Sequence, residues 1–188
     1  MFDFASYHRA SDIAGAVSLL ARYPQAKLLA GGTDVLIQLH HHNARYRHIV
    51  DIHDLPELRG ITLSKEERLR IGSATTFSEI IEHPVAQRHL PALCAAATSI
   101  AGPQIRNVAT YGGNICNGAT SADSATPTLI YDATLEIASP KGVRFTSING
   151  FHTGPGKVAL EQDEILVAFH FPPQPRAHTG SAHFKYAM

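Results

Sequence analysis

Two short glycine-rich segments are the parts of this sequence with the clearest chemical potential. One is Leu28-Leu-Ala-Gly-Gly-Thr-Asp-Val35 and the other is Ala109-Thr-Tyr-Gly-Gly-Asn114. Glycine lets consecutive backbone N–H groups point into one concavity, and such a nest binds an anion such as a diphosphate. Neither segment has the Gly-Lys-Ser/Thr ending of a Walker A loop or the spacing of a G-x-G-x-x-G motif. A Gly-Gly pair after a strand is also a common plain turn, so the residues alone leave both interpretations open.

The residues after the first Gly-Gly pair suit the start of a helix. Thr33 or Asp34 can cap a following helical turn, and a helix N-terminus favours a negative charge. A carboxylate repels a phosphate, however. We therefore expect Asp34 to cap the helix or to accept a hydrogen bond from a hydroxyl group, and not to face a diphosphate.

The remaining reactive side chains form no recognisable catalytic or metal-binding pattern. No Ser/His/Asp arrangement and no pair of catalytic carboxylates follows from the spacing. Cys94 and Cys116 are far apart, which argues against a disulfide framework and against a zinc site built from thiolates. Cys116 lies just after the second glycine segment and is either a reactive thiol or a small buried filler. Adjacent residues on a helix face different ways, so His40-His-His42 does not predict a shared metal site.

Composition and charge predict a globular, cytoplasmic protein. Of 188 residues, 44% are hydrophobic and 17% are charged, which is typical of a folded domain. Sixteen basic residues balance sixteen acidic ones, which leaves no net field to attract nucleic acid or an anionic membrane. The first ten residues lack the pattern of a signal peptide, and proline and glycine interrupt the longest apolar run, 90–105.

The first 55 residues predict a small α/β unit. Ser11 can cap a helix whose apolar positions recur at helical spacing and which ends near Tyr23, since the residue before a proline avoids helical geometry. Apolar runs at 27–30 and 48–52 predict strands on either side of the first glycine turn and a helix-like segment.

Residues 56–175 predict a larger part with mainly antiparallel strands. A charged turn separates short strands at 61–63 and 69–71, and Thr76 with Glu79 fits a capping box. An alanine-rich helix is expected at 90–101. Alternating residues predict further strands at 133–138, 143–146 and 164–171, before a proline-rich connector.

The glycine segments also occur in a recognisable combination. Ala30-Gly-Gly-Thr-Asp34, the run 106–114 and Ser121-Ala-Asp123 together resemble the FAD subunit of molybdenum hydroxylases. That family includes xanthine dehydrogenases, carbon monoxide dehydrogenases and aromatic-acyl-CoA reductases, and the likeness is closest to the separate FAD subunit of bacterial xanthine dehydrogenases. The segments 2–4, 49–52, 164–166 and 184–185 also fall where the family has them, so the resemblance spans nearly the whole chain.

The resemblance implies an α+β fold of two subdomains that hold FAD non-covalently between them. The glycine segments would wrap the diphosphate and ribityl parts, Asp123 would be a polar contact, and Ile165 or Leu166 would lie against the flavin or adenine. Lys185 would be a late contact or else a solvated lysine. The implied cofactor-binding residues are Lys27, Leu28, Leu29, Ala30, Gly31, Gly32, Thr33, Asp34, Val35, Ala109, Thr110, Tyr111, Gly112, Gly113, Asn114, Asp123, Ile165, Leu166 and Lys185.

The resemblance also implies partners. Electrons would enter from [2Fe-2S] clusters and leave to NAD in purine oxidation, and the flavin, not a catalytic side chain, would carry this chemistry. Two cysteines cannot supply the four thiolates of one cluster, so the iron–sulfur and molybdenum centres are expected on partner subunits of a heterotrimer or its multiple.

Two alternatives stay open at this point. One is a stand-alone flavin reductase or oxidase. The other is a shortened, non-catalytic fragment, because the family's FAD subunit continues into a further C-terminal domain. The sequence itself reaches only the start of that domain, which we expect at 176–188.

Overall fold

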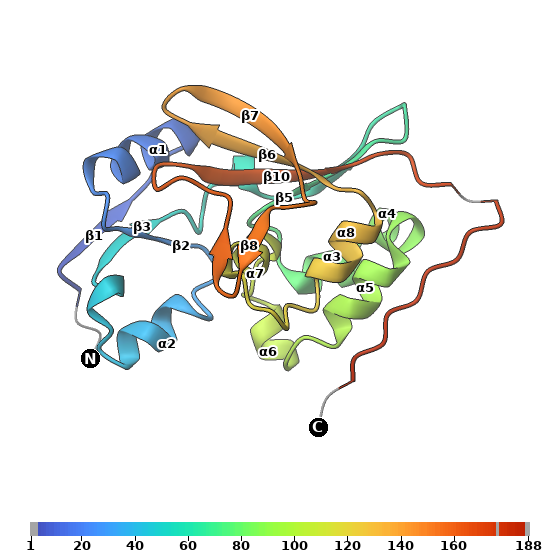
Figure 1. The fold of residues 1–188 in the computed structure, drawn as a ribbon, viewed down its shortest axis with the longest axis horizontal. Helices are drawn as coiled ribbons and strands as arrows, with labels where there is room; N and C mark the ends of the chain where they lie inside the picture. The colour runs from blue at the N-terminus through green and yellow to red at the C-terminus, as the bar shows by residue number, and fades with distance from the viewer. Residues whose placement is uncertain (1–3, 176, 187–188) are drawn as a thin grey trace.

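The computed structural model describes residues 4–175 and 177–186, which form an α+β fold with two main sheets (Figure 1). A three-stranded sheet has the order β1-β3-β2, and a five-stranded sheet has the order β4-β5-β10-β6-β7. This two-subdomain α+β arrangement confirms the predicted fold class. In the described part of the chain, no helix is long and apolar enough to cross a bilayer.

The small subdomain is built around a short parallel sheet. Its elements are β1 (Ser6–Arg9), α1 (Ile13–Arg22), β2 (Lys27–Leu29), α2 (Val35–His40), the 3-10 helix η1 (Ala44–Tyr46) and β3 (His48–Asp51). Strand β3 pairs in parallel with both β1 and β2. The expected cap of α1 was wrong by one residue, because the side chain of Asp12, not Ser11, accepts the hydrogen bond from the Gly15 N–H.

The large subdomain follows a short crossing segment that contains the 3-10 helix η2 (Pro56–Leu58). Its strands are β4 (Ile61–Leu63), β5 (Leu69–Gly72), β6 (Thr134–Ser139), β7 (Gly142–Ser147) and β10 (Ile165–Phe171), and β8 (His152–Gly154) pairs separately with β9 (Lys157–Val158). Its helices are α3 (Phe77–Glu82), α4 (Pro84–His89), α5 (Pro91–Thr98), α6 (Pro103–Arg106), α7 (Tyr111–Asn117) and α8 (Ala125–Ile130). The predicted antiparallel hairpin of β4 and β5 and the capping box of α3 are both confirmed.

The five-stranded sheet holds the two subdomains together. Figure 1 shows α3, α4 and α5 on one side of it and α1 near the other. On the helix side Phe77, Leu93 and Phe169 belong to one buried cluster. On the other side a second cluster joins Leu20 of α1 to Val167 of β10. Because β10 contributes to both clusters, its nearly continuous burial follows from its central position.

The second glycine segment is a helix start and not a turn. Helix α7 begins at Tyr111, directly after its cap Thr110, so Gly112 and Gly113 are helical residues. The sequence interpretation of two similar Gly-Gly turns therefore holds only for the first pair. The reason is local, since a capping hydroxyl at Thr110 can start a helix even where glycine disfavours one.

The end of the described chain runs back along the helices as an extended segment (Figure 1). The hydroxyls of Tyr131 and Ser181 lie 2.7 Å apart, and the Gln174 side chain donates to the Tyr131 carbonyl at 3.3 Å. The predicted boundaries 1–55, 56–175 and 176–188 stay predictions. Residue 176 and residues 187–188, which belong to the last of these, lie outside the described residues.

Candidate functional site

A cavity of about 520 Å³ lies where the two subdomains meet, within the range of small-molecule sites. It brings together all but four of the residues that the sequence singled out, and these come from both glycine segments and from β10. The predicted residues that line it are Lys27, Leu28, Ala30, Gly31, Gly32, Thr33, Asp34, Val35, Ala109, Thr110, Gly112, Gly113, Asn114, Ile165 and Leu166.

The first glycine segment, the turn between β2 and α2, needs both of its glycines. A Cβ on Gly31 would lie 2.0 Å from the backbone oxygen of Val108, so only glycine lets the small subdomain touch the start of the second segment. Gly32 has a φ of 75°, in the left-handed region that disfavours other residues. The two glycines therefore have different roles. Gly31 allows the close approach of the two subdomains, and Gly32 allows the backbone to turn.

The glycines of the second segment pack the first turn of α7. A Cβ on Gly112 would lie 2.6 Å from the Cβ of Ser73, which closes α7 onto the end of β5. A Cβ on Gly113 would meet only the Oγ1 of Thr110, at 2.8 Å. That same Oγ1 accepts a hydrogen bond from the Gly113 N–H at 3.2 Å, so the residue that caps the helix is also one that lines the cavity.

The first segment offers unused hydrogen-bond donors to the cavity. The backbone N–H groups of Gly32, Thr33 and Asp34 have no acceptor among the described residues, whereas the N–H of Leu36 is bonded to the Gly32 carbonyl. Three adjacent free donors are the nest that an anionic group requires. Lys27 and Asp34 are the charged side chains found among the described lining residues. The side chain of Asp34 does not cap α2, which leaves its expected bond to a hydroxyl as a prediction.

The rest of the lining is largely apolar. Ile165 and Leu166 are 1% and 5% exposed, so they serve the core while one side of each borders the cavity. Cys116, which the sequence analysis singled out beside the second glycine segment, also lines the cavity. The sequence analysis did not name the other lining residues as site residues, and they come from separate elements with no shared motif: Ile37, Tyr46, Ile52, Ser73, Phe77, Ile100, Ala101, Ile105, Asn117 and Leu160. A ligand with an anionic part and an apolar part would suit this lining.

Four predicted residues do not line the cavity. Leu29 belongs to β2, with a methyl group near Gly32. The Tyr111 ring is fully buried and stacks on Phe169, and its hydroxyl lies 2.6 Å from that of Thr128. Asp123 and Lys185 pair with each other at 2.6 Å.

The two cysteines and the histidine run show no sign of a reactive or metal-binding site. Burial raises the pKa of the Cys116 thiol to about 12 and that of Cys94 to about 11, which keeps both protonated near neutral pH. Cys116 nevertheless borders the cavity. Of the two roles that the sequence left open for it, the raised pKa favours a packing side chain over a reactive thiol. No group of three metal-binding side chains converges in residues 4–175 or 177–186, the run His40-His-His42 included.

Comparison with known proteins identifies the class of this fold and site. Residues 2–174 match the family described as "FAD binding domain in molybdopterin dehydrogenase". The whole chain is 83% identical to the "Putative xanthine dehydrogenase FAD-binding subunit XdhB" of Escherichia coli K12, and covers 64% of it. It is 35% identical over 167 residues to the carbon monoxide dehydrogenase medium chain of Hydrogenophaga pseudoflava, covering 88% of this chain and 58% of that one.

Solved structures agree with these sequence matches. A carbon monoxide dehydrogenase from Hydrogenophaga pseudoflava superimposes with a TM-score of 0.89 at 34% identity, over 93% of this chain and 61% of that chain. Quinoline 2-oxidoreductase from Pseudomonas putida 86 superimposes with a TM-score of 0.86 at 28% identity, over 93% of this chain and 61% of that chain. The chain thus spans somewhat less than two thirds of the length of each of these relatives.

Proposed function

This chain belongs to the family of FAD-binding domains of molybdopterin dehydrogenases, and from that premise we propose that it is the FAD-binding part of a xanthine dehydrogenase-like hydroxylase. In this proposal electrons pass from [2Fe-2S] clusters on a partner subunit, through FAD, to NAD during purine oxidation in the cytoplasm. The molybdenum centre lies on another partner. The 83% identity over the whole chain to a protein named for xanthine dehydrogenase is the observation that favours purines.

The residues present fit FAD. The free N–H groups of residues 32–34 suit its diphosphate, and Lys27 adds a positive charge to the lining of the cavity. The apolar wall of Ile165 and Leu166 suits a flat ring system. FAD, when bound, supplies the redox chemistry, since a flavin exchanges hydride and electrons. The chain's own residues bind the cofactor, orient it and exclude water from it.

We propose that Asp123 and Lys185 form an ion pair beside the cofactor, outside the cavity wall, and contact a polar group of the cofactor. The Lys185 ammonium is 2.6 Å from the Asp123 carboxylate and 3.3 Å from the Ser99 carbonyl. The side chain of Asp123 is 13% exposed and that of Lys185 is 40% exposed. In such a pair the carboxylate can accept a hydrogen bond from a ligand hydroxyl, or the ammonium can donate one to it, while the two charges stay paired.

One experiment tests the cofactor and the site together. We expect the purified chain to be yellow and to release about one FAD per chain on acid precipitation, since the cavity has room for one ligand. Gly113→Val would place a side chain near Thr110 and into the cavity, so it should lose most of the colour. Gly154→Val is the matched control, because its Cβ would meet only a lysine carbon at 3.9 Å. A folded, colourless wild-type chain that ignores added FAD would contradict the proposal.

The acceptor and the substrate need the partners. The chain should be produced together with candidate molybdenum and iron–sulfur subunits, and the purified complex assayed in parallel with a purine and NAD and with carbon monoxide. Formation of NADH would support the proposal, and turnover of carbon monoxide instead would favour the second candidate. That candidate is the flavin subunit of a carbon monoxide dehydrogenase-type enzyme, which the 34% identity to a solved example supports.

A further inference from the structure

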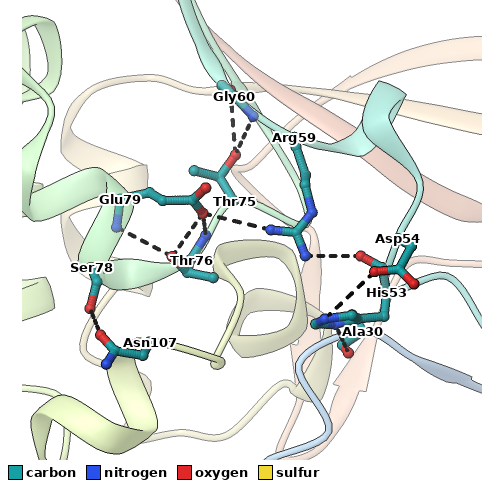
Figure 2. A network of polar contacts seen from close by, with 10 residues as sticks. All are labelled: Ala30, His53, Asp54, Arg59, Gly60, Thr75, Thr76, Ser78, Glu79 and Asn107. Atoms are coloured by element: carbon teal, nitrogen blue, oxygen red, sulfur yellow. Dashed lines mark hydrogen bonds and ion pairs between the residues drawn. The ribbon is translucent and has the colours of Figure 1, made fainter.

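We propose that Arg59 is a positioning residue that sets the spacing between the two glycine segments around the cofactor. Arg59 follows η2, in the segment that crosses from the small to the large subdomain, and its side chain does not line the cavity. It lies in a polar network that reaches Ala30 of the first segment on one side and Thr76 on the other (Figure 2), and Thr76 in turn bridges to Thr110 of the second segment. The inference rests on the proposed FAD site and concerns how that site is held in shape.

On the side of the small subdomain, Arg59 acts through His53. The Arg59 Nη2 donates to the backbone oxygen of His53 at 2.9 Å. The His53 Nδ1 lies 3.0 Å from the backbone oxygen of Ala30, the residue before Gly31. A carbonyl oxygen only accepts, so the His53 Nδ1 carries a proton in this contact. The chain of bonds therefore ends at the base of the first glycine turn.

On the side of the large subdomain, Arg59 acts through Glu79. The Arg59 Nη1 is 3.9 Å from the Glu79 carboxylate, an ion pair but not a direct hydrogen bond. The same Glu79 oxygen accepts from the backbone N–H of Thr76 at 2.6 Å and from its hydroxyl at 2.7 Å. Thr76 forms a bridge with Thr110, the cap of α7. This arm of the network therefore ends at the second glycine segment.

The backbone of Arg59 is fixed, so the side chain can transmit position. The Ala74 N–H donates to the Leu58 oxygen at 2.7 Å, and the Gly60 N–H donates to the Thr75 hydroxyl at 3.0 Å. A Cβ on Gly72 would lie 2.3 Å from the Leu58 oxygen, which shows how closely the crossing segment lies on β5. Hydrogen bonds from a nest to a diphosphate tolerate a few tenths of an ångström, so a small shift of one segment weakens all of them.

Arg70 provides a matched control for the test. Its Nη2 donates to the Glu57 oxygen at 3.2 Å, and its Nε is 3.7 Å from the Glu136 carboxylate. Its side chain is 29% exposed and that of Arg59 is 30% exposed. Arg70 thus makes the same two kinds of contact, but it touches neither glycine segment. A purely structural role predicts similar effects of both arginines.

The experiment compares Arg59→Gln with Arg70→Gln in the full chain, measuring the Kd for FAD by flavin fluorescence and the Tm of the FAD-free protein. We expect Arg59→Gln to raise the Kd about tenfold, which is about 1.4 kcal/mol. Arg70→Gln should change the Kd less than twofold, with a similar loss of Tm. In the double variant with His53→Ala, the Kd should rise little beyond that of Arg59→Gln, because both residues lie on one arm.

Each possible result supports or contradicts the positioning role of Arg59. Equal changes of Kd in the two glutamine variants, or an unchanged Kd in Arg59→Gln, would overturn the inference while leaving FAD binding intact. If Arg59→Gln does not fold, Arg59→Lys against Arg70→Lys replaces it, because one ammonium cannot reach both partners of Arg59. A threefold weaker Kd for Arg59→Lys alone supports the inference, and equal values contradict it. A wild-type chain that takes up no FAD removes the proposed function, and the inference with it.

Discussion

At the scale of single residues, Gly31 is the position where the two subdomains depend most on a missing side chain. A Cβ there would lie 2.0 Å from the Val108 oxygen, and backbone cannot yield as a flexible side chain would. We expect Gly31→Ala to reduce the free energy of unfolding by about 1–3 kcal/mol, the usual cost of overpacking. The subdomains would move apart, so FAD should bind at least tenfold more weakly. Denaturant unfolding and an FAD titration would measure the two effects.

The control for Gly31 is another glycine with ordinary backbone geometry. Gly154→Ala would place its Cβ 3.9 Å from a lysine carbon and no closer to anything else. Its stability should stay within about 0.5 kcal/mol of the wild type, as for most surface changes. If Gly31→Ala behaved like Gly154→Ala in both measurements, the close approach at Val108 would not matter in solution.

At the scale of elements, helix α7 depends on its cap more than its composition suggests. Two glycines in the first turn oppose helix formation, and the Thr110 hydroxyl satisfies the free N–H of Gly113. We expect Thr110→Ala to lower stability by about 1 kcal/mol, the usual value of an N-cap. Because Thr110 also lines the cavity, the same change should weaken FAD binding, and Thr110→Ser should restore most of both.

A second cap separates the two roles of Thr110. Asp12 caps α1 by accepting from the Gly15 N–H at 2.6 Å, and neither residue lines the cavity. Asp12→Ala should therefore cost a similar amount of stability, read from thermal unfolding, but leave the Kd for FAD nearly unchanged. A comparable loss of FAD affinity in both variants would mean that general stability, and not the position of α7, controls binding.

The elements also show how far the sequence could predict this structure. Patterns with a strong local cause, such as the capping box of α3 and the hairpin of β4 and β5, are where they were expected. Strand β1 was missed because four residues with alternating exposure pair only with β3, far along the chain. Helix α7 was missed because glycine argues against a helix, and the Thr110 cap together with contact with Ser73 overrides that preference.

In the candidate site, too, the sequence marks some residues and gives no sign of others. Its two glycine segments could be singled out from residue types, because backbone donors and close approach need glycine, but their role in FAD binding came from the family resemblance. Most of the rest of the cavity lining could not be predicted from the sequence. Ile100 and Leu160 reach the cavity from positions that look like ordinary core or loop residues, and only the packing of the subdomains brings them there. Arg59 carries no signal of its own either, since its partners are backbone oxygens and a carboxylate on another element.

At the scale of the whole molecule, one ion pair ties the edge strand β7 to the start of the central strand β10. Arg144 donates to both oxygens of Glu164, at 2.7 Å each, and to the Ala159 carbonyl at 3.0 Å. The Glu164 side chain is only 7% exposed, and the next residue, Ile165, lines the cavity. This pair therefore connects the edge of the large sheet with the candidate site.

The same pair predicts how the molecule responds to acid. The hydrogen bonds from Arg144 hold the pKa of the Glu164 carboxyl below its ordinary value of 4.5, with help from the Glu161 N–H. A depressed pKa in the folded state adds stability above pH 4.5, and that contribution is lost as the pH falls from 4.5 through the lower, folded value. Glu164→Gln should remove about 1–2 kcal/mol at pH 7, at the low end for charged hydrogen bonds because the Arg144 side chain is 41% exposed.

The measurement is the free energy of unfolding between pH 7 and pH 3 for wild type, Glu164→Gln and Glu66→Gln. Glu66 is the control, because a hydrogen bond from Ser64 also lowers its pKa while its side chain is in solvent. The curves of wild type and Glu164→Gln should converge as the pH falls below 4.5, since protonated Glu164 resembles glutamine. Glu66→Gln should differ from the wild type much less than Glu164→Gln does, because its hydrogen bond from Ser64 is formed in solvent. Parallel curves for wild type and Glu164→Gln would show that the pair adds nothing through its charge, and that the start of β10 is held by packing alone.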